Sequence, residues 1–529
     1  MRCDHLLGAA LCPCRFTWIV VLGAIAAFFA AFGIGANDVA NAYATSVGSK
    51  ALTVKQACAL AVIFEFLGAT FLGGSVVETI RRDIADIEYF ADDPALLMWG
   101  CFCVLFCVGI WLLLMSYLEI AVSTTHSCVG GMIGMTIAAK GYDAVYWAKP
   151  SSSFPWVNGF AGVVLSWIFS PLLSGLASMC LFTTLRALVL RSARPFERAV
   201  LIFPICVAMC FTIITWFMLV KGIKSTEEIQ NLEVGTQIGI AFGVGVGLAL
   251  AGIPAYMMCK KRILNGTFVL KMTAIEEADA AAAAASRAEG GGCTAAEVEM
   301  PTTMGGKVMS AIATSLNTNP HASVGVDAAT TAIHRFAEKF DRKAEAFFTY
   351  LQIFSAIFDS FAHGANDVAN AVGPFATIFV VYSSGVVSSK ADMGEHRYLI
   401  LGLGGLGLGI GLLLYGYKIM RAIGVKLAVI TPARGFCIET GSSLVVILGS
   451  YAGIPLSTTH CQVGATTGVA LLEGSRGCSK WVLLKVTIGA LITCFCVGIL
   501  SALLFSLGAY APMAKPPPPT RAACAAIDA

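Results

Sequence analysis

The octapeptide Gly-Ala-Asn-Asp-Val-Ala-Asn-Ala occupies residues 35–42 and returns unchanged at residues 364–371. A second element, Ser-Thr-Thr-His, follows each copy, at residues 123–126 and again at residues 457–460. The order of the two elements is the same in both halves of the chain. Such self-similarity is the sequence signature of an internal repeat. We therefore predict two equivalent structural units, each built around the same polar residues.

The sequence around these elements is strongly apolar. Of the 529 residues, 57% are hydrophobic and 13% are charged, whereas a soluble domain carries about 25% charged residues. This excludes a cytosolic enzyme, a nucleic-acid binder and a disordered chain. Apolar runs recur at residues 16–34, 56–78, 96–117, 120–138, 157–185, 199–220, 236–258, 346–362, 368–384, 398–416, 424–450, 454–472 and 482–508.

These runs predict an all-α polytopic membrane protein with about ten to thirteen crossings. The runs at 120–138 and 454–472 are short, rich in glycine and interrupted by polar residues. Irregular backbone at membrane depth is tolerated where it is buried in protein or lines a cavity, so we expect re-entrant hairpins there. The fold class is thus two repeated units of transmembrane helices with re-entrant hairpins.

The chain divides at its polar segments. Basic residues follow the run at 157–185 and the run at 236–258, and the positive-inside rule places both of these links in the cytoplasm. The long hydrophilic segment between the halves contains an alanine run and a glycine run, so we expect it to be largely disordered and cytoplasmic. The expected divisions are an N-terminal tail (1–15), a first membrane half (16–258), the linker (259–345), a second membrane half (346–508) and a proline-rich tail (509–529). We expect the plasma membrane as the location.

The octapeptide places a carboxylate and two amides at membrane depth in each half. A carboxylate there costs roughly 2.5–3.5 kcal/mol on insertion scales unless it has partners. Glycine allows the helix to unwind, and the polar oxygens are hard ligands that suit inorganic cations. The alternative is that the amides only hold helices together. The predicted cation-binding residues are Asn37, Asp38, Asn41, Asn366, Asp367 and Asn370.

The Ser-Thr-Thr triplets are suited to the start of a half-helix. Hydroxyl residues are good N-caps, and the first helical turn offers free N–H groups and a positive dipole end. Together these groups predict an anion site, although one copy alone would be an ordinary cap. The predicted anion-binding residues are Ser123, Thr124, Thr125, Ser457, Thr458 and Thr459. His126 and His460 come next and could contact the anion or serve a structural role.

Lysine and arginine are absent from residues 16–49, 101–139, 344–389 and 435–475, which contain every copy of both elements. An anion bound here would meet two aspartates without a basic side chain in these segments. Bound inorganic cations would resolve that conflict, so the sequence predicts an anion whose binding depends on cations held at Asp38 and Asp367. Further residues with a coupling role in this hypothesis are Glu65, Glu439 and His363.

At these residues the chain resembles the inorganic phosphate transporter family of sodium- or proton-coupled phosphate symporters. The resemblance rests on both octapeptides and both Ser-Thr-Thr-His elements, and it spans about 16–258 and 346–508. It implies inverted repeats, a central phosphate site, a homodimer and functional roles for Glu65 and Glu439. The first copy carries Ile34 where the second has His363, so a role for that histidine applies to one half only.

We therefore predict a secondary active transporter that imports inorganic phosphate by sodium symport through alternating access, without an enzymatic activity or a cofactor. A proton-coupled phosphate permease or a sulfate permease is the alternative. An intramembrane hydrolase with Ser123 or Ser457 as nucleophile is disfavoured, because no Gly-x-Ser-x-Gly elbow exists and the constellation occurs twice. A passive channel or a receptor on the same scaffold would not accumulate its ligand against a gradient.

Overall fold

The computed structural model describes residues 16–82, 84–150, 156–222, 232–268, 312–313, 316–317, 319–324, 327–388, 393–451, 456–474 and 476–510. The N-terminal tail, nearly all of the proline-rich tail and the middle of the linker lie outside these residues. The disorder predicted for the linker therefore falls mainly on residues that are not described.

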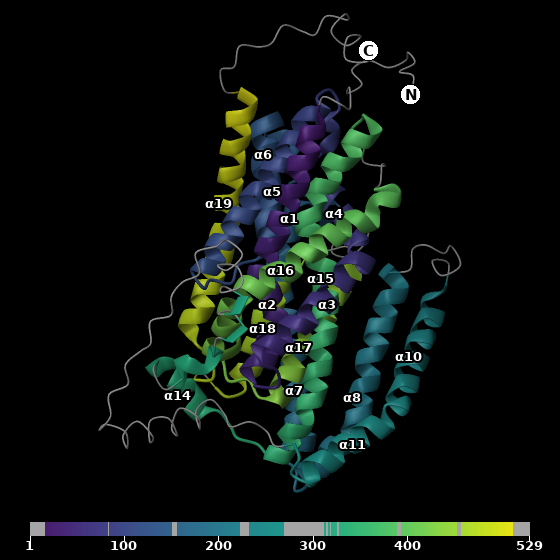
Figure 1. Cartoon of the computed structure of the whole chain (residues 1–529), viewed down its shortest axis with the longest axis vertical. Helices are drawn as coiled ribbons and strands as arrows, with labels where there is room; N and C mark the ends of the chain where they lie inside the picture. The colour runs from purple at the N-terminus through teal and green to yellow at the C-terminus, as the bar shows by residue number, and fades with distance from the viewer. Residues whose placement is uncertain are drawn as a thin grey trace, which may run out of the picture.

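The described residues form an elongated bundle of helices (Figure 1). One small antiparallel sheet pairs β1 (Lys149–Pro150) with β2 (Val157–Asn158). The first half contains α1 (Thr17–Asn37), α2 (Val39–Gly48), α3 (Val54–Leu72), α4 (Gly74–Arg82), α5 (Pro94–Tyr117), α6 (Thr124–Lys140), α7 (Phe160–Leu185), α8 (Pro195–Phe217), α10 (Val234–Ala251) and α11 (Ile253–Leu264). The rest contains α14 (Ala328–Phe336), α15 (Arg342–Ser384), α16 (Arg397–Arg421), α17 (Pro432–Tyr451), α18 (Thr458–Leu471) and α19 (Lys480–Tyr510).

Eight helical stretches among the described residues are long and apolar enough to cross a membrane. The all-α polytopic prediction is therefore confirmed. The count is lower than the predicted number of crossings, because α6 and α18 have only 17 and 14 residues and because polar residues interrupt the apolar sequence of α15 and α17. The eight stretches are Thr17–Gly48, Val54–Leu72, Pro94–Tyr117, Phe160–Leu190, Pro195–Val220, Val234–Ala251, Gly394–Leu427 and Lys480–Tyr510.

Two predicted boundaries in the second half are wrong. The runs at 346–362 and 368–384 form one continuous helix, α15, of 43 residues. This helix starts within the predicted linker because the Asp341 side chain accepts a hydrogen bond from the Ala344 amide and caps it. The run at 424–450 is also divided, since a π-helical segment (Ala422–Leu427) extends α16 and α17 begins only at Pro432.

The octapeptide helix of each half packs on a helix of the other half. A Cβ atom on Gly35 of α1 would lie 1.9 Å from the Leu408 carbonyl oxygen of α16. At the equivalent position in the second copy, a Cβ atom on Gly364 of α15 would lie 2.4 Å from the Glu65 carbonyl oxygen of α3. The single glycine of each octapeptide is therefore required for a close contact between helix backbones.

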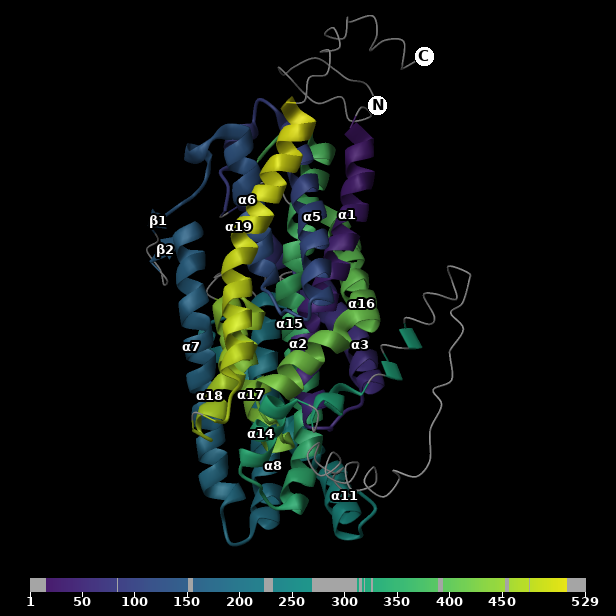
Figure 2. The same ribbon diagram turned by 90° about the vertical axis from the view of Figure 1, so that its left-hand side faces the viewer.

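Each Ser-Thr-Thr-His helix also packs on a helix of the other half of the chain. A Cβ atom on Gly130 of α6 would lie 2.2 Å from the Cys494 oxygen of α19, and one on Gly464 of α18 would lie 2.3 Å from the Pro171 oxygen of α7. Figure 2 shows α6 beside α19 in the upper part of the molecule and α18 beside α7 in the lower part. Inversion of the repeats stays a prediction, and these equivalent contacts support it.

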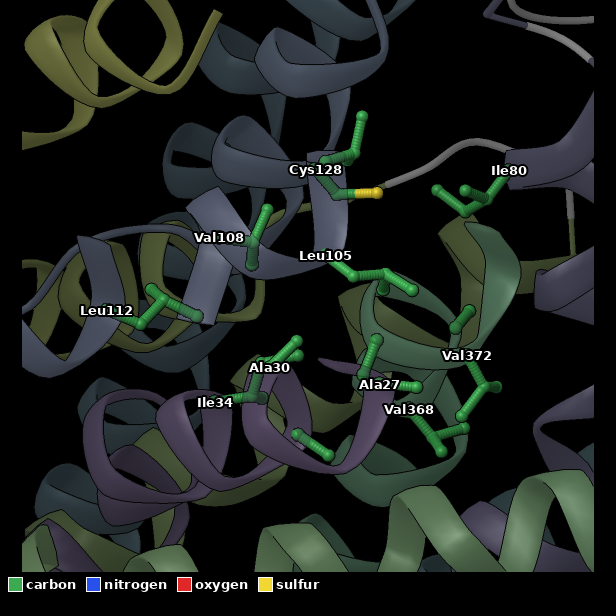
Figure 3. Close-up of a cluster of buried hydrophobic side chains, with 14 of the residues drawn as sticks. Ala27, Ala30, Ile34, Ile80, Leu105, Val108, Leu112, Cys128, Val368 and Val372 are labelled. Carbon is green, nitrogen blue, oxygen red and sulfur yellow. The ribbon is translucent and has the colours of Figure 1, made fainter. Parts of the chain in front are cut away.

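A buried apolar cluster joins the octapeptide helices to their neighbours (Figure 3). Small side chains on α1, including Ala27 and Ala30, are fully buried against α5 and α15. Close packing of this kind fixes helix positions, because a packed interior yields little to a change in side-chain volume. The labelled members are Ala27, Ala30, Ile34, Ile80, Leu105, Val108, Leu112, Cys128, Val368 and Val372. The cluster therefore holds α1 and α15 where they bring both aspartates together.

Candidate functional site

The two octapeptides differ in backbone structure. In the first copy α1 ends at Asn37, Asp38 forms a turn and α2 begins at Val39. In the second copy α15 runs through Asp367 without a break. The predicted unwinding is therefore limited in the first half to a single-residue interruption at Asp38, whose amide still donates to the Ile34 oxygen at 2.7 Å, and it is wrong for the second half, where Gly364 serves helix packing.

The predicted helix starts at the Ser-Thr-Thr triplets are confirmed. Ser123 caps α6 and accepts a hydrogen bond from the His126 amide at 3.3 Å. Ser457 caps α18 in the same way, accepting from the His460 amide at 3.2 Å. The oxygens of both serines are thus used in capping, which leaves the threonines as the hydroxyl donors that face the aspartates.

Asp38 accepts hydrogen bonds from threonines of both halves. The Thr124 hydroxyl donates to it at 2.9 Å and the Thr459 hydroxyl at 2.5 Å, and the Thr458 oxygen lies within hydrogen-bond distance of it, at 3.3 Å. The Asp38 side chain is 1% exposed. The residues predicted to bind a cation and those predicted to bind the anion therefore form one buried cluster.

Asp367 occupies the equivalent position in the other half of this cluster. It accepts from the Thr458 hydroxyl at 2.8 Å and from the Asn370 amide at 3.4 Å. Asn370 also donates to Thr124 at 3.1 Å and to Thr125 at 3.4 Å. Asn370 therefore links the aspartate of the second half to the threonines of the first.

The first asparagine of each octapeptide holds backbone that precedes a half-helix. The Asn37 side chain donates to the Ile120 oxygen at 3.0 Å and accepts from the Val122 amide at 2.9 Å. The Asn366 amide donates to the Leu456 oxygen at 3.5 Å. These two contacts match the alternative in which the amides hold helices together. Asn41 lies on α2, but its side chain is outside the described part of the chain.

His363 lies among the carboxylates. Its Nε2 atom is 2.9 Å from an Asp367 oxygen and 3.9 Å from an Asp38 oxygen, while Nδ1 is 3.5 Å from a Glu65 oxygen. Asp38, His363 and Asp367 offer ligand atoms that all lie within 4.8 Å of one another. The two carboxylates could hold a hard cation, and a protonated imidazole could replace part of that charge.

Two further buried acids lie on helices that pack against α15, namely Glu439 on α17 and Glu65 on α3. Glu439 accepts hydrogen bonds from the Thr45 hydroxyl at 2.5 Å and the Ser46 hydroxyl at 2.9 Å, and also from the Ser355 hydroxyl. Glu65 accepts from the Ser360 hydroxyl at 3.1 Å. Both glutamates are fully buried. Glu65 adjoins the aspartate cluster through His363, whereas Glu439 is held by hydroxyls of α2 and α15.

The sequence analysis missed Asp359 as a buried acid. Asp359 lies on α15, is 5% exposed and accepts a hydrogen bond from the Ser443 hydroxyl of α17. The signal was present, since an aspartate within the apolar run at 346–362 is a functional candidate by the rule for intramembrane charges.

The histidines that follow the threonines lie on a different side of their helices. The His126 ring stacks on Trp167 with 3.7 Å between centroids and lies 4.7 Å from the His460 ring. Both rings line a cavity between α7, α18 and α19. This placement favours a role for His126 and His460 outside the aspartate cluster.

The bundle of membrane helices and the buried cluster of carboxylates and hydroxyls define a polytopic membrane transporter. The phosphate transporter family model matches residues 34–501. This range includes both octapeptides and both Ser-Thr-Thr-His elements. The chain belongs to the phosphate transporter family, and it is an integral membrane protein.

Relatives match over most of the chain. The phosphate-repressible phosphate permease pho-4 of Neurospora crassa is 29% identical, covering 94% of this chain and 98% of its own length. The inorganic phosphate transporter 2-1, chloroplastic, of Arabidopsis thaliana is 31% identical over 88% of this chain and 68% of its own. The sodium-dependent phosphate transporter of Plasmodium falciparum is 28% identical over 86% of each chain.

A solved structure is similar in fold as well as in sequence. It is described as the sodium-dependent phosphate transporter and superposes with a TM-score of 0.68 at 29% identity. The similarity covers 93% of this chain and 98% of that chain. The resemblance drawn from the repeated elements is thus confirmed at the level of family and fold.

Proposed function

We propose that this chain imports inorganic phosphate by sodium symport through alternating access. In this proposal Asp38 and Asp367 bind sodium, assisted by their asparagine neighbours. The hydroxyls and N–H groups at the starts of α6 and α18 bind phosphate. Two relatives named as sodium-dependent phosphate transporters, one of them a solved structure, support sodium as the co-substrate.

The observation that carries the proposal is the bonding of the threonines to the aspartates. Thr458 lies within hydrogen-bond distance of Asp367 and Asp38, at 2.8 and 3.3 Å. A hydroxyl has a single proton to donate, so a threonine that donates to a carboxylate cannot donate to phosphate. Sodium bound to the carboxylates takes the place of these hydroxyls as their partner. The released hydroxyls then donate to phosphate, which makes phosphate binding depend on sodium.

Electrostatic repulsion between phosphate and the aspartates also makes phosphate binding depend on sodium. Two unit charges of like sign at 4 Å repel by about 4 kcal/mol at an effective dielectric constant of 20. Phosphate beside two ionised aspartates therefore binds poorly, whereas sodium ions between them turn repulsion into attraction. The order that follows is sodium first and phosphate second, with release in the cytoplasm.

Alternating access is supported by where the cluster lies between helices. Asp38 lies between α1 and α2 and Asp367 lies on α15, and these helices pack with α3 and α16. The threonines are on α6 and α18, which pack with α7 and α19. A shift of one set against the other would open the cluster to alternate sides. We also propose a homodimer in the plasma membrane, with the linker in the cytoplasm, on the basis of the family and of the basic links.

Uptake into sealed vesicles tests the proposal. Labelled phosphate should accumulate above its equilibrium level when an inward sodium gradient is imposed, and excess sulfate should leave uptake unchanged. Phosphate that equilibrates without accumulating would indicate a passive channel. Strong competition by sulfate would instead indicate a general permease for tetrahedral oxyanions.

Proton coupling is the second candidate, and His363 is the observation that favours it. Its ring lies among Asp38, Asp367 and Glu65, and histidine changes its charge near neutral pH. Under proton coupling, choline would replace sodium without loss of uptake, and an inward proton gradient would drive accumulation. Under sodium coupling, His363→Gln should retain sodium-driven uptake and show a flatter pH profile, whereas the exposed control His396→Gln should behave as the parent.

A further inference from the structure

A separate cavity of about 660 Å³ lies between α7, α18 and α19. Its walls are apolar, and several lining side chains are also exposed on the outer surface of the bundle, so it opens toward the lipid-facing side. Leu172 is 63% exposed, Leu176 58% and Leu491 54%. Helix α18 separates the cavity from the aspartate cluster: Thr458 and Thr459 bond to the aspartates, while His460 lines the cavity.

The wall nearest α6 carries polar ring atoms without partners. Within the described part of the chain, both ring nitrogens of His126 are buried and lack a hydrogen-bond partner, as do Nδ1 of His460 and Nε1 of Trp167. His126 is fully buried, and all three rings line the cavity. A buried polar group without a partner is unfavourable, so a ligand that forms hydrogen bonds with these ring atoms gains affinity beyond its contacts with the apolar walls.

We propose that this cavity binds an uncharged amphiphile from the bilayer, with an apolar body and a single terminal hydroxyl. The tryptophan N–H can only donate, whereas a neutral imidazole donates from one nitrogen and accepts at the other. A hydroxyl both accepts and donates, so it can pair with Trp167 and with a histidine at once. A charged head group is excluded because the walls offer it no counter-charge. The cavity volume falls within the range of roughly 300–1,000 Å³ that is usual for ligand sites.

Occupancy of the cavity should also affect transport, and this part rests on the proposed function. The ligand would contact α18, which carries Thr458 and Thr459, and α19, which packs on α6. It would therefore lie within the set of helices that carries the threonines, directly behind the start of α18, where it can restrict the rearrangement that releases the Thr458 and Thr459 hydroxyls from the aspartates. An occupant should slow uptake without displacing phosphate.

The test uses the full chain in lipid nanodiscs and a long-chain alcohol that carries a photoreactive diazirine. Controls are its methyl ether and a hydrocarbon of equal length. The alcohol should label peptides from α7 and α19 that line the cavity, and the ether should bind about tenfold more weakly, as expected for one lost hydrogen bond. Leu172→Trp, which fills the opening, should abolish the labelling. The matched control Leu173→Trp changes an exposed neighbour outside the lining and should retain it.

Further variants test the hydroxyl contact itself. Trp167→Phe keeps an aromatic ring against His126 and removes the N–H, so it should reduce the preference for alcohol over ether. His126→Leu should do the same, and size-exclusion chromatography checks that each variant is folded. Equal labelling by all three reagents would overturn the proposal in favour of ordinary lipid chains. Absence of labelling from a folded protein would also overturn it. Neither result depends on whether the chain transports phosphate.

Discussion

At the scale of single residues, Thr458 is where the two halves of the site meet. Its hydroxyl donates to Asp367 and lies within reach of Asp38. Thr458→Val keeps the side-chain shape and removes the hydroxyl, so the proposed phosphate site loses one hydrogen-bond donor. We expect the KM for phosphate to rise about tenfold, the size of one buried hydrogen bond. Uptake normalised to surface protein provides the measurement.

Two matched variants control this experiment. Thr458→Ser restores the hydroxyl and should restore most of the affinity. Thr466→Val removes a hydroxyl that donates only to the Gln462 oxygen within the same helix, and it should leave the KM unchanged. A normal KM in Thr458→Val would show that this threonine is not a phosphate ligand.

At the scale of elements, the octapeptide glycines set the distance between helices. Gly35→Ala would place a methyl group 1.9 Å from the Leu408 oxygen of α16, so the helices must separate. Overpacking of this kind costs about 1–3 kcal/mol. We expect less folded protein and a lower Tm. Gly239→Ala on α10 is the control, because an added Cβ there meets nothing within 4 Å; equal losses in both variants would contradict this account.

A second element-scale prediction concerns the contact between the start of α17 and the segment after α18. Arg434 is 1% exposed and pairs with Glu473 at 2.5 Å. Glu473→Gln leaves a buried guanidinium without its counter-charge, which costs about 3–5 kcal/mol. We expect a marked fall in Tm for the detergent-solubilised protein. Glu197→Gln disrupts an exposed pair with Arg194 and should change Tm little; a similar Tm in both variants would contradict the prediction.

The contact between Glu338 and Arg191, which lies near Arg434, has a defined response to pH. Glu338 accepts hydrogen bonds from Arg191, and this contact holds the pKa of the Glu338 carboxyl below its usual value of 4.5. A lowered carboxyl pKa contributes stability above the usual value, and that stability is lost as pH falls through the lowered one. Acidification from pH 7 to pH 5 should therefore leave this contact intact.

The repeated elements allowed much of this arrangement to be predicted from sequence. Ser123 and Ser457 begin helices because a serine before an apolar run is a local capping signal. The continuity of α15 could not be predicted, since Gly364 reads as a break until Glu65 of α3 is known to lie against it. The direct bonding of Thr459 to Asp38 was also missed, because it joins opposite halves of the chain.

At the scale of the whole molecule, the last part of the linker contacts both halves of the membrane domain. The 3₁₀ segment Pro320–Ser323 packs on α2, and His321 contacts the Val47 oxygen at 3.1 Å. His334 of α14 makes the equivalent contact with the Val425 oxygen at 3.1 Å. The last part of the linker is therefore attached to the membrane domain at two points.

These contacts divide the linker into two parts with different expected roles. Deletion of 270–311 should leave the KM for phosphate unchanged, because the described partners of Asp38 and Asp367 all come from α6, α15 and α18. Deletion of 270–325 also removes His321 and should lower uptake per surface molecule. Equal uptake by the two deletions would mean that the contact with α2 has no role in transport.

The most direct test of sodium coupling is the sodium activation curve of Asp38→Asn. The substitution keeps the shape of the side chain and removes the charge that the account assigns to sodium. Uptake of phosphate should be measured against sodium concentration and normalised to surface protein, with Asp93→Asn, an exposed acid paired with Lys140, as the control. The account predicts that half-maximal uptake of Asp38→Asn requires far more sodium than the parent, or that uptake is abolished, while the control is unchanged. A folded Asp38→Asn protein with an unshifted sodium curve would contradict it.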